Sequence, residues 1–255
     1  LSCKNRLRQL SIGLLNFESA KQRFPSASRL HQNDRDLGVS WRVILLPYIE
    51  ESAIYEQIGP LPNGGAKDWT SRLTPVPTFL CPSMPERQTT QISHYEAING
   101  AGLERMSLEQ NQSGDCFTDG ILYPDSRTSI SEIEDGTTKT LLLGERNYHP
   151  TASNWMAGAE KVGSPPSKVS SFASKNMVYG INDKTLSYKF DPRAAPGSDK
   201  SMLFNDLYFG SNHKNGAHFS YADGSVHWLD DSISVVVLSA MASRAGNEVV
   251  SDATP

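Results

Sequence analysis

The chain has 255 residues, of which 38% are apolar and 20% are charged, and its formal net charge at pH 7 is −4. This length can bury one large core or two small ones, and the slightly acidic balance excludes the basic footprint of a nucleic-acid-binding protein. The sequence contains no run of 18 apolar residues, so it predicts no membrane-spanning segment within these residues.

The first 25 residues predict a long amphipathic helix that starts abruptly, as if cut from a longer one. The helix should end before Pro25, because the proline ring disfavours the helical conformation at Phe24. Apolar residues at steps of three and four form one stripe, which consists of Cys3, Leu7, Leu10, Leu14 and Phe17. Three further apolar residues fall on the opposite side and suggest a second apolar face, namely Leu1, Ile12 and Leu15. A second face predicts a packing partner in addition to the chain's own core.

The three cysteines, Cys3, Cys81 and Cys116, are too few for a disulfide framework and lack the spacing of a zinc site. Two alternatives remain open at this point. Cys3 and Cys81 could form a bridge in an oxidising compartment, or all three could be buried thiols.

A helical segment and several strands are expected in the middle of the chain. Ser40 to Ile58 predicts a helix with Ser40 as its cap and a break at Pro47. Residues 62–85 are loop-like, and residues 160–200 resemble a surface excursion. Lys139 to Gly144 is apolar on both faces, so it should be a central strand. The other expected strands are His94–Ile98, Gly120–Tyr123 and Asn154–Ala159.

Ala217 to Leu229 is typical of a β-hairpin with Asp223-Gly224 as a two-residue turn. Such a turn places Tyr221 opposite Val226 and Phe219 opposite Trp228. These four side chains would then share the core face of the hairpin.

The other face of this hairpin would carry His218 and His227, and His213 lies just upstream. Three histidines raise the possibility of a zinc site. Polar residues on a half-exposed sheet face are the favoured interpretation, so no metal ligand is predicted.

No enzyme is predicted. The nucleophile-elbow, zinc-protease, P-loop and dinucleotide motifs are all absent from the sequence. Two acidic residues follow regular segments, Glu145 and Glu248, and pairing with Arg146, Arg244 or Arg42 is their expected role. The sequence therefore suggests no catalytic residue and no cofactor.

Six segments, in order along the chain, carry a resemblance to a known family. His213, nine intervening residues and Asp223-Gly224 resemble the H-x9-DG signature of a family of planctomycete proteins, DUF1559 or SBP_bac_10. The other five segments that are similar to this family are CKNRLRQLSIGLLNFESAKQRFP, SWRVILLPYIEESAIY, FLCPSMP, IEDGTTKTLLLGE and SRAGNE. Cys116 has no counterpart in the family pattern, so the resemblance implies that any disulfide would join Cys3 to Cys81.

Members of this family resemble type IV pilins and type II secretion pseudopilins at their N-termini. The resemblance implies an α+β, pilin-like fold, in which a long N-terminal helix packs on an antiparallel sheet with large loop insertions. Residues 1–25 would be the C-terminal half of that helix, and residues 26–255 a single globular head. A membrane-spanning half would precede Leu1 and anchor the protein to the inner membrane, with the head in the periplasm or at the cell surface.

Two functions are consistent with this resemblance. The first is a non-enzymatic pilin-like subunit that contacts other pilin-like subunits or secretion-system components through Leu1, Ile12 and Leu15. The second is a module that binds an extracellular solute or glycan, for which Trp69 and Trp155 are the candidate exposed aromatics. His213, Asp223 and Gly224 of the signature are expected to be structural.

Overall fold

The computed structural model describes residues 2–31, 36–84, 91–106, 113–147, 154–162, 168–183 and 203–247. Its helices are α1 (Ser2–Lys21), α2 (Trp41–Leu45), α3 (Ser52–Ile58) and α4 (Val235–Ala242). Its strands are β1 (Leu37–Val39), β2 (Tyr95–Gly100), β3 (Arg105–Met106), β4 (Cys116–Phe117), β5 (Leu141–Glu145), β6 (Ala157–Val162), β7 (Lys168–Ser171), β8 (Ser174–Asn176), β9 (Gly216–Tyr221) and β10 (Val226–Asp230). Short 3-10 turns at Leu46–Tyr48, Thr70–Leu73, Pro77–Phe79, Ile130–Glu132 and Phe204–Asp206 connect them.

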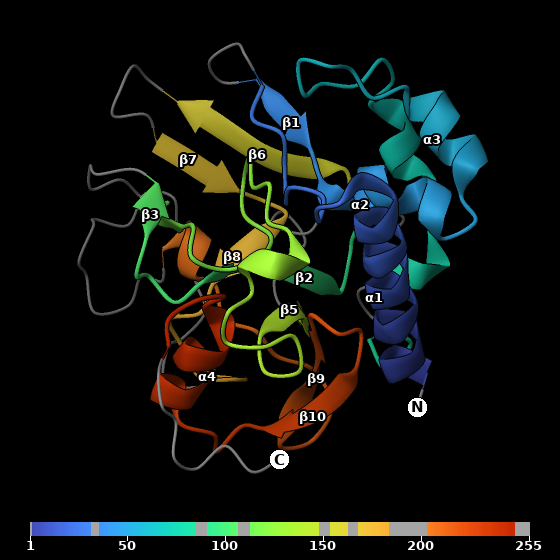
Figure 1. Cartoon of the computed structure of the whole chain (residues 1–255). Coiled ribbons are helices and arrows are strands. Elements are labelled where there is room, and N and C mark those ends of the chain that lie inside the picture. The colour runs from blue at the N-terminus through green and yellow to red at the C-terminus, as the bar shows by residue number, and fades with distance from the viewer. Residues whose placement is uncertain are drawn as a thin grey trace.

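A five-stranded sheet in the order β10-β9-β5-β2-β8 forms the centre of the molecule (Figure 1). All of its pairings are antiparallel except that of β2 with β8. The middle strand is β5, whose five residues are all buried. The central position predicted for Lys139–Gly144 is therefore confirmed, because a strand covered on both faces needs apolar side chains on both.

The long helix α1 lies along this sheet and contacts β9, β10 and β5 (Figure 1). Its buried residues follow the predicted stripe and include Leu7, Leu10 and Leu14. Phe17 continues the stripe at the rim, where its ring meets that of Tyr48 edge to face at 5.3 Å. The structure is α+β, as the sequence predicts, with the N-terminal helix packed on a sheet.

Two apolar clusters cover the central sheet. Tyr95 and Ala97 of β2 belong to the cluster that contains the buried side of α1. Ile98, the next residue along β2, belongs to the other cluster, together with Leu238 of α4. Because neighbouring strand residues point to opposite faces, α1 and α4 are placed on opposite sides of the sheet.

A smaller antiparallel sheet, in the order β1-β6-β7, lies beside the first (Figure 1). The segment Ser40–Ile58 is helical with Ser40 as its cap, as predicted, since Oγ of Ser40 accepts a hydrogen bond from the amide of Arg42 and caps α2. A 3-10 turn that contains Pro47 then separates α2 from α3.

One predicted strand is absent, and one segment predicted to be a surface excursion contains strands. Gly120–Tyr123 is not a strand, because its backbone forms single hydrogen bonds instead of a ladder: the Gly120 amide donates to the Asn99 carbonyl of β2, and the Gly120 carbonyl accepts from the Arg244 side chain. Residues 160–200 are not only a surface excursion, since they contain β7 and also β8, which completes the central sheet. Residues 184–200 lie outside the described part of the chain.

The register of the β9–β10 hairpin differs by one residue from the prediction. Val226 pairs with Ser220 and Trp228 pairs with His218. The Gly224 amide donates to the Tyr221 carbonyl, and Gly224 itself has a φ of +82°. The connection is thus a three-residue loop with a glycine bulge instead of a two-residue turn.

This shift reverses the environment of Trp228 because side chains alternate between faces. Trp228 was expected in the core but is exposed to 38%, on the same face as His218. His227 now pairs with Phe219 and lies on the other face. The two hairpin histidines are therefore not brought together.

Candidate functional site

A buried carboxylate at the end of the central strand, that of Glu145, contacts two histidines. Glu145 is fully buried, and its Oε2 accepts a hydrogen bond from the backbone amide of His218 at 2.7 Å. Nδ1 of His218 lies 3.1 Å from the same oxygen, and Nε2 of His213 lies 3.7 Å from Oε1. Pairing with β9 places His218 beside Glu145, so two segments 73 residues apart build this contact.

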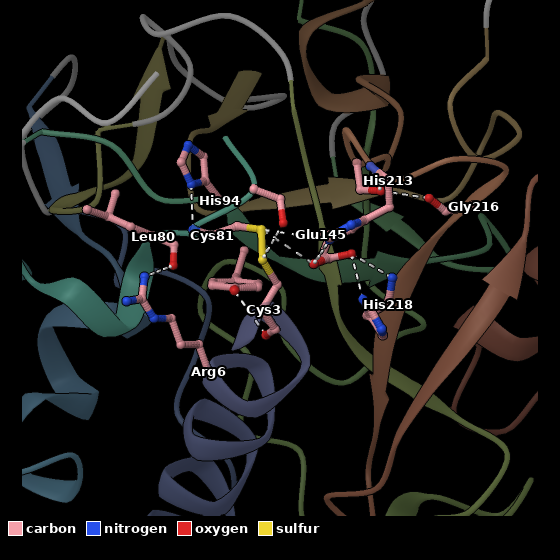
Figure 2. The surroundings of a disulfide bond; sticks show 12 residues. Cys3, Arg6, Leu80, Cys81, His94, Glu145, His213, Gly216 and His218 are labelled. Atoms are coloured by element: carbon pink, nitrogen blue, oxygen red, sulfur yellow. Dashed lines mark hydrogen bonds and ion pairs between the residues drawn. A yellow bond between two sulfur atoms is a disulfide. The ribbon is translucent and has the colours of Figure 1, made fainter. Parts of the chain in front are cut away.

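A disulfide bond between Cys3 and Cys81 lies directly against this group (Figure 2). The Cys81 sulfur is 3.9 Å from Oε1 of Glu145 and 4.0 Å from Nε2 of His213. Both half-cystines are buried. The bridge, which the residues alone left open, thus joins the first turn of α1 to the loop before β2.

Several hydrogen bonds hold the two ends of this bridge in place (Figure 2). Nη1 of Arg6 donates to the Leu80 carbonyl at 2.6 Å, and the Cys81 amide donates to Nδ1 of His94 at 2.7 Å. The hydroxyl of Tyr95 donates to the Cys3 carbonyl at 3.1 Å. Burial, followed by the nearby Glu145 carboxylate, raises the pKa of the Tyr95 phenol, so this hydroxyl stays protonated as a donor.

Four of the segments that carry the family resemblance meet here. They contribute Cys3, Cys81, Glu145 and His213, one residue each. Asp223-Gly224, the other part of the H-x9-DG signature, lies beyond the far end of β9, about 20 Å away at 3.3 Å per residue. His213 therefore belongs to the Glu145 group, whereas Asp223 and Gly224 form the hairpin loop.

An aromatic side chain covers the outer side of this group. The Trp228 ring contacts the His218 ring at 5.0 Å and the His213 ring at 6.0 Å between centroids. The two histidine rings also meet each other edge to face at 5.5 Å. Sequence reasoning missed this surface, because it depends on the one-residue register of the hairpin.

The expected arginine partners of Glu145 bind a different carboxylate. Glu96 contacts both Arg42, at 2.7 Å, and Arg146, and all three side chains are buried. The third candidate, Arg244, pairs with Glu104 at 3.3 Å. Glu248 lies outside the described residues.

A second buried polar group lies around β8. The ammonium of Lys175 donates to the Ser171 carbonyl and lies 3.7 Å from the centre of the Phe204 ring. Burial, reinforced by the positive charges of Arg146 and Arg42, holds the pKa of Lys175 well below its usual value. Burial also raises the pKa of Asp206 to about 6, although Asn176 donates a hydrogen bond to it at 2.7 Å.

Two of the three residues predicted for an assembly face are described by the structure, and they differ in exposure. Ile12 is exposed to 47%, but Leu15 is half-buried and packs on the core. A Cβ built on Gly224 would lie 2.7 Å from Cδ1 of Leu15, so this side chain lies against the hairpin loop. Leu1 lies outside the described residues.

The tryptophans predicted to contact a ligand are not free surface residues. Trp155 is fully buried, because its ring packs against Phe79 and its Nε1 donates to the Arg72 carbonyl at 3.1 Å. Its expected exposure is therefore wrong. Trp69 is half-buried and packs against the main core.

Among the helices in the described part of the chain, none has the length and apolar character needed to cross a membrane. No curated protein and no solved structure matches the chain. A family model described as a protein of unknown function (DUF1559), SBP_bac_10, matches residues 1–235. Because this match covers most of its length, the chain belongs to the DUF1559 family.

Proposed function

We propose that this protein is a non-enzymatic subunit of the cell envelope that is anchored to the inner membrane and exposes its head outside the cytoplasm. In this proposal, α1 contacts pilin-like subunits or components of a secretion system. The observation that carries the proposal is the division of α1 into a buried side and an exposed side.

The exposed side of α1 is polar except at its centre. Leu7, Leu10 and Leu14 are buried against the head, whereas Ile12 is exposed to 47%. The other exposed residues of the helix are Ser2, Asn5, Arg8, Gln9, Asn16, Ser19, Ala20 and Lys21. Burial of a single isoleucine with a polar rim matches the composition of a modest, reversible contact between subunits.

The disulfide supports the proposed location of the head outside the cytoplasm. Bridges such as Cys3–Cys81 form and persist in oxidising environments and are rare in the cytosol of most organisms. Trapping of free thiols in intact cells by acid quenching and alkylation should find Cys3 and Cys81 oxidised. Recovery of both as free thiols would argue against an extracytoplasmic head.

Site-specific crosslinking tests the assembly contact. An Ile12→Cys variant in native membranes, treated with a bismaleimide, should form a discrete crosslinked species with a neighbouring subunit. Val236→Cys is a matched control, since Val236 is 75% exposed but lies on α4, on the other side of the central sheet. If Ile12→Cys yields no specific product, or if both variants yield the same one, α1 is not an assembly surface.

A second candidate function, binding of an extracellular solute or glycan, is favoured by one observation. Trp228 exposes part of its ring next to two histidines, and an aromatic platform flanked by hydrogen-bonding groups suits a sugar ring. A glycan array probed with purified protein should then show binding that Trp228→Ala weakens about 10-fold or more, whereas Trp69→Ala retains it. An array without any reproducible signal would exclude a glycan ligand of this surface.

A further inference from the structure

Three ligand-type atoms form a nearly regular triangle beside the disulfide. The Cys81 sulfur lies 4.0 Å from Nε2 of His213 and 3.9 Å from Oε1 of Glu145, and these last two atoms are 3.7 Å apart. The Cys3 sulfur completes the set, and all four atoms lie within 4.8 Å of one another. No other group of this kind occurs among the described residues.

These separations are close to those of a tetrahedral zinc site. Zinc binds sulfur at about 2.3 Å and nitrogen or oxygen at about 2.0 Å, so its ligand atoms are about 3.3–3.8 Å apart. The edge between Nε2 of His213 and Oε1 of Glu145, 3.7 Å, lies within this range, and the two edges from the Cys81 sulfur, 3.9 and 4.0 Å, exceed it by about 0.2 Å at most. The two sulfurs are closer than the range, because the covalent bond holds them 2.03 Å apart.

We propose that Cys3, Cys81, His213 and Glu145 bind Zn²⁺ when the disulfide is reduced, so that metal binding and disulfide formation exclude each other. A dithiol reductant would supply two electrons and two protons, become a disulfide itself, and leave Cys3 and Cys81 as thiols. Each thiol would then lose its proton to solvent as its sulfur binds the metal. Reoxidation by a disulfide-containing oxidant would re-form the bridge and release the Zn²⁺.

The surroundings of the four ligands suit this role. Glu145 directs Oε1 toward the sulfurs, because the amide and Nδ1 of His218 lie at hydrogen-bonding distance from Oε2. Such contacts from outside the ligand set fix the orientation of a ligand and raise metal affinity. The His213 side chain is 25% exposed, which provides an approach from solvent to an otherwise buried site.

This inference does not rest on the proposed function. It concerns the chain before its disulfide has formed, when α1 and the loop at Cys81 have no covalent link. Zinc would then join the same two elements that the disulfide joins later.

Metal binding by the purified chain tests the proposal. Protein reduced anaerobically with a phosphine, which is oxidised to its phosphine oxide with an oxygen atom from water, should retain one equivalent of Zn²⁺ after dialysis. The oxidised protein should retain none. Co²⁺ in place of Zn²⁺ should give sulfur-to-cobalt charge-transfer absorption and the intense visible bands of a tetrahedral site.

Matched variants distinguish this site from chance binding to thiols. His213→Gln should lower Zn²⁺ affinity about 10-fold or more, while His227→Gln, which alters an exposed histidine on the opposite face, should not. Cys3→Ser and Cys81→Ser should each weaken the charge-transfer absorption by about half or more, since one of the two thiolate ligands is lost, whereas Cys116→Ser should leave it unchanged.

Three results would overturn the proposal. The first is that the reduced protein retains no stoichiometric Zn²⁺. The second is that the His213→Gln and His227→Gln variants bind Zn²⁺ with equal affinity. The third is that the reduced chain loses its near-ultraviolet circular dichroism and Zn²⁺ does not restore it. This third result would show that the reduced chain is unfolded, so that any metal bound to its thiols is not held by the four proposed ligands.

Discussion

At the scale of single residues, the charged side chains buried beside the central sheet depend on their partners. Glu96 contacts two arginines, Arg42 and Arg146, and all three are almost completely buried. The removal of one partner from such a group leaves a charge without compensation in a medium of low polarity. Asp206, by contrast, is a buried acid that forms no ion pair with an arginine of the described residues, and burial raises its pKa.

Glu96→Gln should destabilise the protein by about 3 to 5 kcal/mol, because two arginine charges lose the carboxylate that compensates them. Chemical denaturation at neutral pH measures this loss. Glu104→Gln is the matched control, since Glu104 pairs with Arg244 at 3.3 Å but its side chain is 62% exposed, and an exposed pair contributes less than about 1 kcal/mol. If both variants lost the same unfolding free energy, burial would not be the reason that the Glu96 ion pairs matter for stability.

The pKa of Asp206 predicts a specific dependence of stability on pH. Its native pKa of about 6 exceeds the ordinary value of 3.8, so between these values the native state binds more protons than the unfolded state. Asp206 thereby adds about 2 to 3 kcal/mol to the free energy of unfolding. This stabilisation is complete below the unfolded pKa and is lost as the pH rises through about 6. The charged groups near Asp206 are Lys175 and Asp115.

Asp206→Asn should remove this component, so the free energy of unfolding of the variant should fall less than that of the wild type between pH 4 and pH 7. Urea denaturation at several pH values gives the two curves. Glu134→Gln, which changes an exposed carboxylate, should follow the wild-type curve. Parallel curves for Asp206→Asn and the wild type would show that Asp206 titrates normally.

At the scale of elements, α1 buries one of its sides against the head and exposes most of the other. Its buried residues form a stripe at steps of three and four, and the opposite side is polar around Ile12. The hairpin loop contributes to the fit, since Gly224 leaves room for Leu15 where a side chain would collide with it. The packing of the helix therefore depends on both its own periodicity and the shape of the loop below it.

Leu10→Ala should cost about 2 to 5 kcal/mol, because it leaves a cavity between α1 and the sheet. Ile12→Ala, two residues away on the exposed side, should change stability by less than about 0.5 kcal/mol. Thermal or denaturant unfolding of the purified variants makes the comparison. A large loss in Ile12→Ala would mean that this side of α1 is covered in the isolated protein.

At the scale of the whole molecule, the disulfide joins the helix to the head across 78 residues of sequence. A long closed loop restricts the unfolded chain strongly, so the bridge stabilises the native state mainly through the entropy of the unfolded state. The loop includes most of α1 together with β1, α2 and α3. The bond therefore acts on most of the N-terminal third of the molecule.

A Cys3→Ala/Cys81→Ala double variant should lose about 4 kcal/mol of unfolding free energy, as expected for a loop of this length. Guanidinium denaturation without reductant measures the loss. Cys116→Ala, which removes a buried free thiol, should cost considerably less. A double variant as stable as the wild type would show that the unfolded chain is already compact without the bridge.

Features that depend on neighbours along the chain could be predicted from the amino-acid sequence. The α1 stripe follows from residues three and four apart, the cap at Ser40 from one hydroxyl, and the central β5 from apolar residues on both faces. The family resemblance also indicated correctly which two cysteines are joined. In each case the physical cause lies within one element or in one short motif.

The contacts between distant segments could not be predicted from the sequence and become visible in the folded molecule. A one-residue register of the hairpin exposes Trp228 and separates His218 from His227, and the sequence around Asp223-Gly224 is compatible with either loop. Glu145 contacts histidines rather than arginines because β5 pairs with β9. These outcomes depend on packing between elements far apart in the sequence, which local periodicity does not contain.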